Sequence, residues 1–305
     1  METLDPLYIN TAQSGLLAKK IETAGAALER CGLCPRKCHV DRLSGATGIC
    51  RTGPRAMVSS FHAHFGEEAP LVGINGSGTI FFTCCNLMCT FCQNFDISHQ
   101  GAGREVSDDE LAAMMLSLQD QGCHNINLVT PSHVVPQILS ALEIAAHKGL
   151  HIPIIYNSGG YDDIDTVKLL EGVIDIYMPD FKFWDPKIAE ITCNAPDYPE
   201  IAKKALREMH RQVGDLIIDN AGIARRGLLI RHLVLPDDLA GTRYIVQFIR
   251  RTLSPDTYVN IMSQYRPCGR AHETKELDRA LSADEYRRAL QMARNEGLTR
   301  LDRVC

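Results

Sequence analysis

From residue 79 onward, this chain of 305 residues alternates apolar runs of strand length with longer segments of helical spacing. Six runs have the length of a β-strand: 79–84, 125–130, 152–157, 173–179, 228–235 and 257–262. Nearly continuous apolar runs of this kind are typical of parallel strands that helices cover on both faces. The repeated order of strand and helix therefore predicts an α/β fold with a parallel sheet.

Helical spacing of apolar residues fills the gaps between the strand-like runs. The predicted helices span residues 107–121, 133–148, 162–171, 197–213, 241–252 and 282–296. Ser107 and Glu110 have the spacing of a capping box at the start of the first of these helices. Right-handed crossovers would curl such a sheet into a barrel or a doubly wound layer. Because polar residues follow several strands directly, as at the mouth of a barrel, we predict an incomplete (β/α)6 TIM-like barrel over residues 76–305.

Residues 1–75 are predicted to form an N-terminal extension with a helix and a cysteine-rich, metal-binding segment. Residues 11–30 place leucine and isoleucine at helical spacing and predict one helix. The segment from Cys31 to Cys50 is rich in glycine, proline and arginine, which indicates a loop held by a metal. Residues 56–83 predict short β segments interrupted by glycines.

The overall composition indicates where the protein works and with what. The formal net charge of -5 argues against a general affinity for phosphates, so we do not expect a nucleic acid as partner. The sequence has no apolar run near the ~20 residues of a membrane span and no secretory signal. We therefore expect a cytoplasmic protein that does not enter a membrane. In that reducing compartment, the twelve cysteines indicate metal binding rather than disulfides.

Three of the cysteines, Cys85, Cys89 and Cys92, stand in one short loop directly after the first strand-like run. Thiolates this close in sequence are able to face one soft metal centre. Four would close a structural zinc site or an electron-transfer cluster, whereas three leave one metal position open for chemistry. The spacing leaves two other interpretations open: thiols that pack as small apolar side chains, and a zinc site completed by a distant histidine.

The C-x3-C-x2-C spacing, with the aromatic Phe91 before the last cysteine, resembles the signature of the radical S-adenosylmethionine (SAM) enzymes. In that family the three thiolates bind a [4Fe–4S] cluster, and the amino and carboxylate groups of SAM chelate the fourth iron. One electron from the cluster cleaves SAM to a 5′-deoxyadenosyl radical, which abstracts hydrogen from a substrate. The resemblance implies that the cofactors carry the chemistry, while the protein positions them and excludes solvent.

The sequence from Gly76 to Asn94 is also similar to the start of the pyruvate formate-lyase-activating enzymes, and most similar to an uncharacterised subgroup named as their homologues. Later segments fit the same pattern in order: 125–133, 153–161, 175–182, 227–236 and 260–267. This resemblance implies a glycine in a partner glycyl radical enzyme as the substrate, and a flavodoxin or ferredoxin as the electron donor. A radical SAM enzyme that modifies RNA or a small metabolite, and a non-catalytic zinc-binding interaction protein, remain as alternatives.

The activase resemblance also implies cofactor contacts after the later strands. Asp180 and Lys182 match a D-x-K segment near the cofactor, where the amine would contact the SAM carboxylate; a surface ion pair is the alternative. Strand alternation allows only one of Arg231 and His232 to face a barrel interior. The activase pattern places His232 there, near the adenosyl group, with a core histidine as the alternative.

Other predicted cofactor contacts follow the first three runs. Phe91 is expected beside the cofactor, and Asn157 and Ser158 suit hydrogen bonding to a ribose or a carboxylate, although their segment is also a turn sequence. Thr130 and Ser132 stand where most of the superfamily has a Gly-Gly-Glu segment that holds the SAM amino group. A hydroxyl or a backbone carbonyl would have to accept those hydrogen bonds here.

A second group of cysteines lies upstream, at Cys31, Cys34, Cys38 and Cys50. Four thiolates close a site for zinc or for an auxiliary iron–sulfur cluster, and the spacing does not separate the two. Nearby basic residues would offset the anionic charge of such a centre: Arg36, Lys37, Arg42 and Arg51. Reduced structural thiols, or a zinc module that touches a partner protein, are the alternatives.

Overall fold

The computed structural model describes residues 4–302, and its single large sheet has six parallel strands at the centre. In spatial order these are β2 (Ser77–Phe82), β4 (Ile126–Val129), β5 (Ile154–Ser158), β6 (Ile176–Pro179), β8 (Ala224–Leu233) and β9 (Tyr258–Met262). Each overlaps one of the six predicted runs. Within the described residues β9 and β2 do not pair, so the sheet stays open. The α/β class is therefore confirmed, and the open parallel sheet is consistent with a partial barrel.

Three further strands run antiparallel to their neighbours. They are β1 (Ala56–His64) beside β2, β3 (Arg104–Val106) beside β1, and β7 (Ile217–Ile218) beside β8. In place of several short β segments over residues 56–83, the structure has the long β1, the short helix α3 (Ala69–Val72) and β2. Part of the predicted N-terminal extension thus continues the main sheet, and the boundary at residue 75 stays a prediction.

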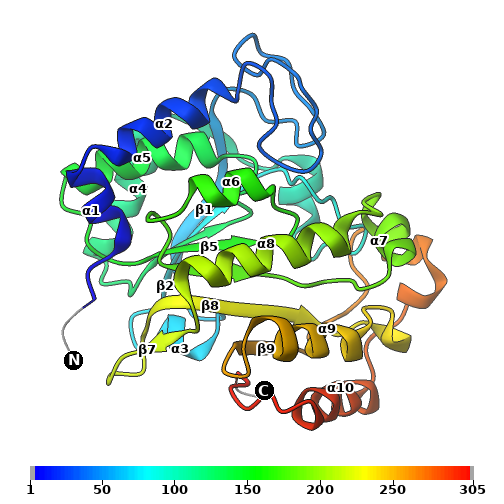
Figure 1. Ribbon diagram of the computed structural model, residues 1–305. Helices are drawn as coiled ribbons and strands as arrows, with labels where there is room; N and C mark the ends of the chain where they lie inside the picture. Colours follow the sequence, from blue (N-terminus) through cyan, green and yellow to red (C-terminus); the bar gives the residue numbers. More distant parts are fainter. Residues whose placement is uncertain (1–3, 303–305) are drawn as a thin grey trace.

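Helices follow the parallel strands at the predicted positions. They are α4 (Asp108–Asp120), α5 (Val135–His147), α6 (Ile164–Leu169), α8 (Tyr198–Val213), α9 (Thr242–Phe248) and α10 (Ala283–Asn295). The predicted capping box is confirmed, since the Ser107 side chain accepts from the Glu110 backbone and the Glu110 side chain accepts from the Ser107 backbone. Figure 1 shows α8 crossing the front of the sheet, with α9 and α10 below it.

The remaining helical elements are short and were not predicted. They are α7 (Pro186–Cys193), η1 (Asp96–Gln100), η2 (Pro236–Asp238), η3 (Ile249–Leu253), η4 (Ala271–Glu273) and η5 (Lys275–Leu277). None of the helices that the structure describes has the length and apolar character needed to cross a membrane.

The predicted helix over residues 11–30 is two helices, α1 (Leu7–Gln13) and α2 (Leu16–Ala26). Gly15 separates them with a φ of 73°, a left-handed conformation that the apolar spacing does not reveal. The backbone N–H of Leu7 donates to the buried Asp175 carboxylate at 2.8 Å, which anchors α1 next to the start of β6. The prediction was wrong in extent because one glycine decides the break.

The parallel strands are buried on both faces, as their continuous apolar character predicted. On the face that lies away from the main helical layer, a buried apolar cluster contains Ile155, Ile176, Met178 and Leu229. Successive side chains of a strand alternate between faces, so residues two positions further on share this face. Those residues are Asn157, Asp180 and Arg231, at the carboxyl ends of three neighbouring strands. One face of the sheet thus changes from apolar to polar at its carboxyl edge.

We expect Gly160 to be essential to the turn after β5. Its φ is 76°, and a Cβ atom built there would lie 2.0 Å from the Asp180 carbonyl oxygen. Gly149 is a matched control, because its φ is 96° but no heavy atom lies within 4 Å of a built Cβ. Gly149→Ala should lower the free energy of unfolding by about 1 kcal/mol, and Gly160→Ala by about 3 kcal/mol because overpacking adds to the strain. Urea unfolding measures both, and equal losses would contradict the steric explanation.

Candidate functional site

The carboxyl ends of the parallel strands surround a cleft made of two adjoining hollows. The inner hollow holds about 750 Å³ and the outer hollow about 1070 Å³, each including its open side. Both hollows are lined by Cys89, Cys92, Asn157, Asp180, Lys182 and Arg231. Because these residues are shared, the two hollows form one continuous space, named here the main cleft.

The loop after β2 brings the three cysteines to this cleft. Cys85 lines the inner hollow, and Cys89 and Cys92 line both. The backbone takes positive φ values at Cys84 (63°) and Met88 (59°), so the strand does not continue through the loop. Cys84 consequently lines the inner hollow beside Cys85, although continued strand alternation would have pointed it away. Such conformations are costly for residues other than glycine and gather at functional sites.

Hydrogen bonds to two of these sulfurs stabilise their negatively charged thiolate form. The backbone N–H of Leu87 donates to Cys85 Sγ at 3.3 Å, and the Ser98 hydroxyl donates to Cys92 Sγ at 3.2 Å. Burial nevertheless raises the pKa of Cys85 to about 12 and raises the pKa of Cys92. A bound cation is therefore required to hold these sulfurs as thiolates near neutral pH.

The described residues contain no site for a single metal ion at these thiols. Across residues 4–302, no three His, Cys, Asp or Glu side chains are gathered closely enough to hold one metal ion. In a [4Fe–4S] cluster each cysteine binds a different iron, so the sulfurs stand apart around a shared space. Three cysteines on one hollow meet that requirement and leave one iron without a protein thiolate.

A buried ion cluster lies opposite the cysteines. Arg231 Nε donates to Asp180 Oδ1 at 2.9 Å, Lys182 Nζ pairs with the other carboxylate oxygen, and Arg231 Nη2 donates to Asn157 Oδ1 at 2.6 Å. Burial alone would raise the pKa of Asp180, but Arg231 and Lys182 together hold it below its usual value. Asp180 in turn keeps Lys182 charged by raising its pKa. The cleft therefore presents two fixed cations to a ligand.

The other predicted contacts divide between the cleft and its supports. Phe91 lines the outer hollow, and Thr130 lines the inner one with a φ of 63°. Ser158 also lines the inner hollow, while its hydroxyl donates to Asp162 Oδ2 at 2.5 Å. Ser132 lines neither hollow, because its hydroxyl donates to Asp162 Oδ1 at 2.6 Å. Asp162, which the sequence did not single out, thus holds two of the predicted side chains.

His232 does not face the cleft, which corrects its predicted place near the adenosyl group. The side chain is fully buried on the opposite face of β8, where its ring nitrogens contact the Phe181 carbonyl at 2.8 Å and the Thr242 hydroxyl at 2.9 Å. Arg231 takes the cleft position instead. Arg231 shares its face of β8 with Leu229 of the apolar core, two positions earlier, and the structure is needed to show which face that is.

Sequence reasoning also missed part of the outer rim. Glu67 lines the outer hollow with His64, whose Nδ1 lies 3.1 Å from Glu67 Oε1. Glu67 Oε2 lies 3.7 Å from Arg231 Nη1. Gln264 lines this hollow, whereas the neighbouring Tyr265 does not and donates to the Leu277 carbonyl. Glu67 comes from the antiparallel hairpin, so no strand-end pattern pointed to it.

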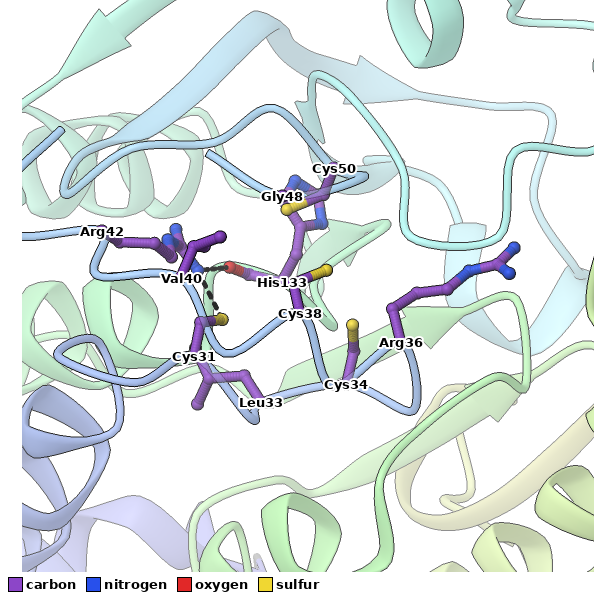
Figure 2. A pocket seen from close by; sticks show the side chains of 10 residues that line it. All are labelled: Cys31, Leu33, Cys34, Arg36, Cys38, Val40, Arg42, Gly48, Cys50 and His133. Carbon is purple, nitrogen blue, oxygen red and sulfur yellow. Dashed lines mark hydrogen bonds between the residues drawn. The ribbon is translucent and has the colours of Figure 1, made fainter. Parts of the chain in front are cut away.

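The upstream cysteines line a separate small cavity in the loop before β1, of about 340 Å³ when its open side is included. Figure 2 shows Cys31, Cys34, Cys38 and Cys50 from close by, together with His133 from the start of α5. The predicted second group is therefore brought together around one space. Burial raises the pKa of Cys34 to about 12 and raises the pKa of Cys50, so a bound cation would favour the ionised form of these two sulfurs.

Comparison with known proteins gives two matches. Residues 79–221 match the family model described as the Radical SAM superfamily. The chain is also 32% identical over 291 residues to the uncharacterized protein MJ0674 of Methanocaldococcus jannaschii, and the match covers 93% of this chain and 80% of that protein. The matched family segment contains the three-cysteine loop and the strands from β4 to β6.

Removing the buried carboxylate should destabilise the cleft. We expect Asp180→Asn to lower the free energy of unfolding by about 3 kcal/mol at pH 7, because two buried cations lose their anion. The pKa of Asp180 is lowered in the folded state, so its contribution is fully present above about pH 4 and is lost at lower pH. The difference between variant and wild type should shrink accordingly in urea unfolding below pH 4.

An exposed ion pair provides the control for this measurement. Asp165 lies 3.7 Å from Lys168 and is 82% exposed. Asp165→Asn should change the free energy of unfolding by less than about 0.5 kcal/mol at either pH. Equal effects of the two substitutions would show that burial of the ion cluster does not matter.

Proposed function

This chain belongs to the radical SAM superfamily, and from that premise we propose that it is an activase-like oxidoreductase acting on a glycine in a partner glycyl radical enzyme. The superfamily uses a [4Fe–4S] cluster and SAM. When bound, these cofactors supply a 5′-deoxyadenosyl radical that abstracts hydrogen. The observation that carries the proposal is the meeting of three cysteines and a buried cation pair in one cleft.

Cys85, Cys89 and Cys92 are the proposed cluster ligands. They line the inner part of the cleft, and the N–H···S and O–H···S bonds from Leu87 and Ser98 stabilise the thiolate form. Buried thiols with perturbed pKa values and their own hydrogen-bond donors support a ligand role over passive packing.

Lys182 and Arg231 are the proposed anchors for the SAM carboxylate. Both are charged and lie at the boundary between the two hollows, where a ligand held beside the cysteines would meet them. Lys182 is the better candidate, because Arg231 already donates to Asp180 and Asn157. Charge-assisted hydrogen bonds of this kind orient a carboxylate strongly.

The remaining SAM groups need acceptors, since the Gly-Gly-Glu segment is absent. Thr130 lines the inner hollow with a left-handed backbone, and we assign the SAM amino group to its hydroxyl or carbonyl. Ser158 lines the same hollow and is assigned to the ribose, with Asp162 holding its hydroxyl in place. Ser132 is left out of this assignment because it donates to Asp162 behind the cleft.

A protein substrate is supported by the rim of the outer hollow. Gly66, Gln93, Asn94 and Gln264 line this hollow and are exposed, so it opens to the surface. Next to Gly66 the side chain of Phe65 is 62% exposed. A large exposed aromatic side chain beside an open cleft favours a macromolecular partner over a small enclosed metabolite. The net charge of -5 makes RNA the weaker candidate.

Substituting one cluster ligand tests the chemistry. Anaerobically reconstituted protein should cleave SAM to 5′-deoxyadenosine under strong reductant, and Cys89→Ala should lower the rate at least about 100-fold, since the cluster loses one of its three ligands. Cys123→Ala is the control, because Cys123 is equally buried but lines neither hollow. Full iron loading without SAM cleavage would refute the enzymatic proposal, and zinc without iron would favour a binding protein.

The substrate is tested by electron paramagnetic resonance. Incubation with SAM, reductant and a glycyl radical enzyme encoded near this chain should produce a stable glycyl radical in that partner. The radical should be absent with the Cys89→Ala variant. SAM cleavage with no glycyl radical in any such partner would move the substrate to another class, such as a small metabolite or RNA.

Lys182→Met should weaken SAM binding. Loss of a charge-assisted hydrogen bond costs about 1.5–3 kcal/mol, so the KM for SAM should rise at least about tenfold. Lys187→Met is the matched control, since Lys187 is exposed outside the cleft. An unchanged KM, measured by 5′-deoxyadenosine release, would transfer the carboxylate-binding role to Arg231.

A further inference from the structure

The segment of residues 27–55, between α2 and β1, contains no helix or strand. Irregular segments this long are uncommon inside a compact fold and need another source of order. Its four cysteines are candidate metal ligands that line one cavity. Cys31, Cys34 and Cys50 are less than a tenth exposed. Gly48 lies so close that a Cβ there would be 2.6 Å from Cys38 Sγ, so the cavity wall leaves no room for a larger residue.

A buried arginine beside this cavity lacks a carboxylate partner. Arg42 is 1% exposed, and no ion pair to it occurs among residues 4–302. Its guanidinium donates to the carbonyls of Gly53 and His133 and lies 3.9 Å from Cys31 Sγ. An unpaired buried charge is costly. An anionic group in the cavity would compensate Arg42, and four thiolates on a metal centre carry that charge.

His133 provides a second unpaired group in the same cavity. The side chain is 1% exposed and lines the cavity. Its Nε2 lies 3.0 Å from the Thr83 carbonyl, so Nε2 carries the hydrogen and Nδ1 holds a lone pair. This Nδ1 is buried and has no hydrogen-bond partner in the described structure. Buried polar atoms without partners are rare in folded proteins, and here the cavity is where a partner would sit.

Three side chains connect this cavity with the loop that carries Cys85, Cys89 and Cys92. Arg36 donates to the carbonyls of Asn86 at 2.9 Å and Leu87 at 3.1 Å. Arg51 donates to the His99 carbonyl and lies 3.9 Å from Cys84 Sγ. His133 reaches the Thr83 carbonyl.

Each connecting side chain belongs to the cavity or to a residue next to it in sequence. Arg36 and His133 line the cavity, and Arg51 follows Cys50. His133 contacts the start of the cysteine loop at Thr83, and Arg36 contacts its centre at Asn86 and Leu87. Arg51 contacts His99 in η1, which follows the loop. An ordered cavity therefore orders the loop, because Arg36 and Arg51 are carried by the cysteine segment and His133 lines the same cavity.

We propose that Cys31, Cys34, Cys38 and Cys50 bind a second iron–sulfur cluster, and that this centre holds the Cys85–Cys92 loop in place through Arg36, Arg51 and His133. Four thiolates suit a cluster or zinc, and the iron analysis below distinguishes the two. The binding claim concerns residues outside the main cleft and does not depend on SAM cleavage.

Iron analysis of one variant isolates the second centre. The triple variant Cys85→Ala, Cys89→Ala, Cys92→Ala, reconstituted anaerobically as the full chain, should retain about four iron atoms and as many acid-labile sulfides. Wild-type protein and the Cys123→Ala control should hold about eight. Adding Cys34→Ala and Cys50→Ala to the triple variant should remove the remaining iron. A triple variant that is folded by circular dichroism but holds no iron, or zinc alone, would overturn the assignment.

The coupling to the loop is tested by changing a connecting residue that is not a ligand. Because Arg36 also lines the upstream cavity, the iron of Arg36→Met protein is first measured in the triple-variant background, and any loss from the second centre is subtracted. In the otherwise wild-type chain the substitution should lower the iron at the Cys85–Cys92 site at least about threefold and speed hydrogen exchange over residues 83–99. Arg30→Met, at an exposed position in the same segment, is the control.

Two results would overturn the coupling while leaving the proposed enzymatic function untouched. The first is Arg36→Met protein with full iron content and unchanged exchange over residues 83–99. The second is a loop that exchanges equally fast whether or not the second centre is loaded. Failure of SAM cleavage with both centres loaded would instead count against the proposed function alone.

Discussion

Parallel pairing of six strands is the constraint on which the site depends. Because neighbouring strands run in the same direction, all their carboxyl ends meet at one edge of the sheet. The bridge between Asp180 and Arg231 is the clearest case, since it joins residues 51 positions apart in the chain. Without that register, the carboxylate and its cation would each be buried alone at a large free-energy cost.

Charge is balanced differently in the two cysteine-lined spaces. In the main cleft, Asp180 compensates Lys182 and Arg231 within the protein, so the cations are held ready but do not depend on a ligand. In the upstream cavity, Arg42 has no carboxylate among the described residues and faces only thiols and carbonyls. The first arrangement suits exchange of a cofactor, whereas the second suits a permanently bound anionic centre.

Much of the fold was predictable because strands that are buried on both faces consist almost entirely of apolar residues. The run at 152–157 and the later runs needed no tertiary information to be identified as strands. The prediction of one helix over residues 11–30 failed because Gly15 breaks it. The prediction for His232 failed because Arg231, its neighbour on β8, faces the cleft instead. Choosing between such neighbours required the strand register rather than residue type.

By itself, the sequence determined the α/β class, the three-cysteine loop and the positions of Asp180 and Lys182, because each depends on local spacing or on residues next to a strand. Only the tertiary structure decided which polar groups share a space. Ser132 hydrogen-bonds to Asp162 outside the cleft, and Glu67 from the hairpin lines the outer hollow. Arg36 connects the upstream cysteine segment to the cysteine loop of the main cleft. Those relations depend on contacts between residues far apart in the chain, which local spacing does not encode.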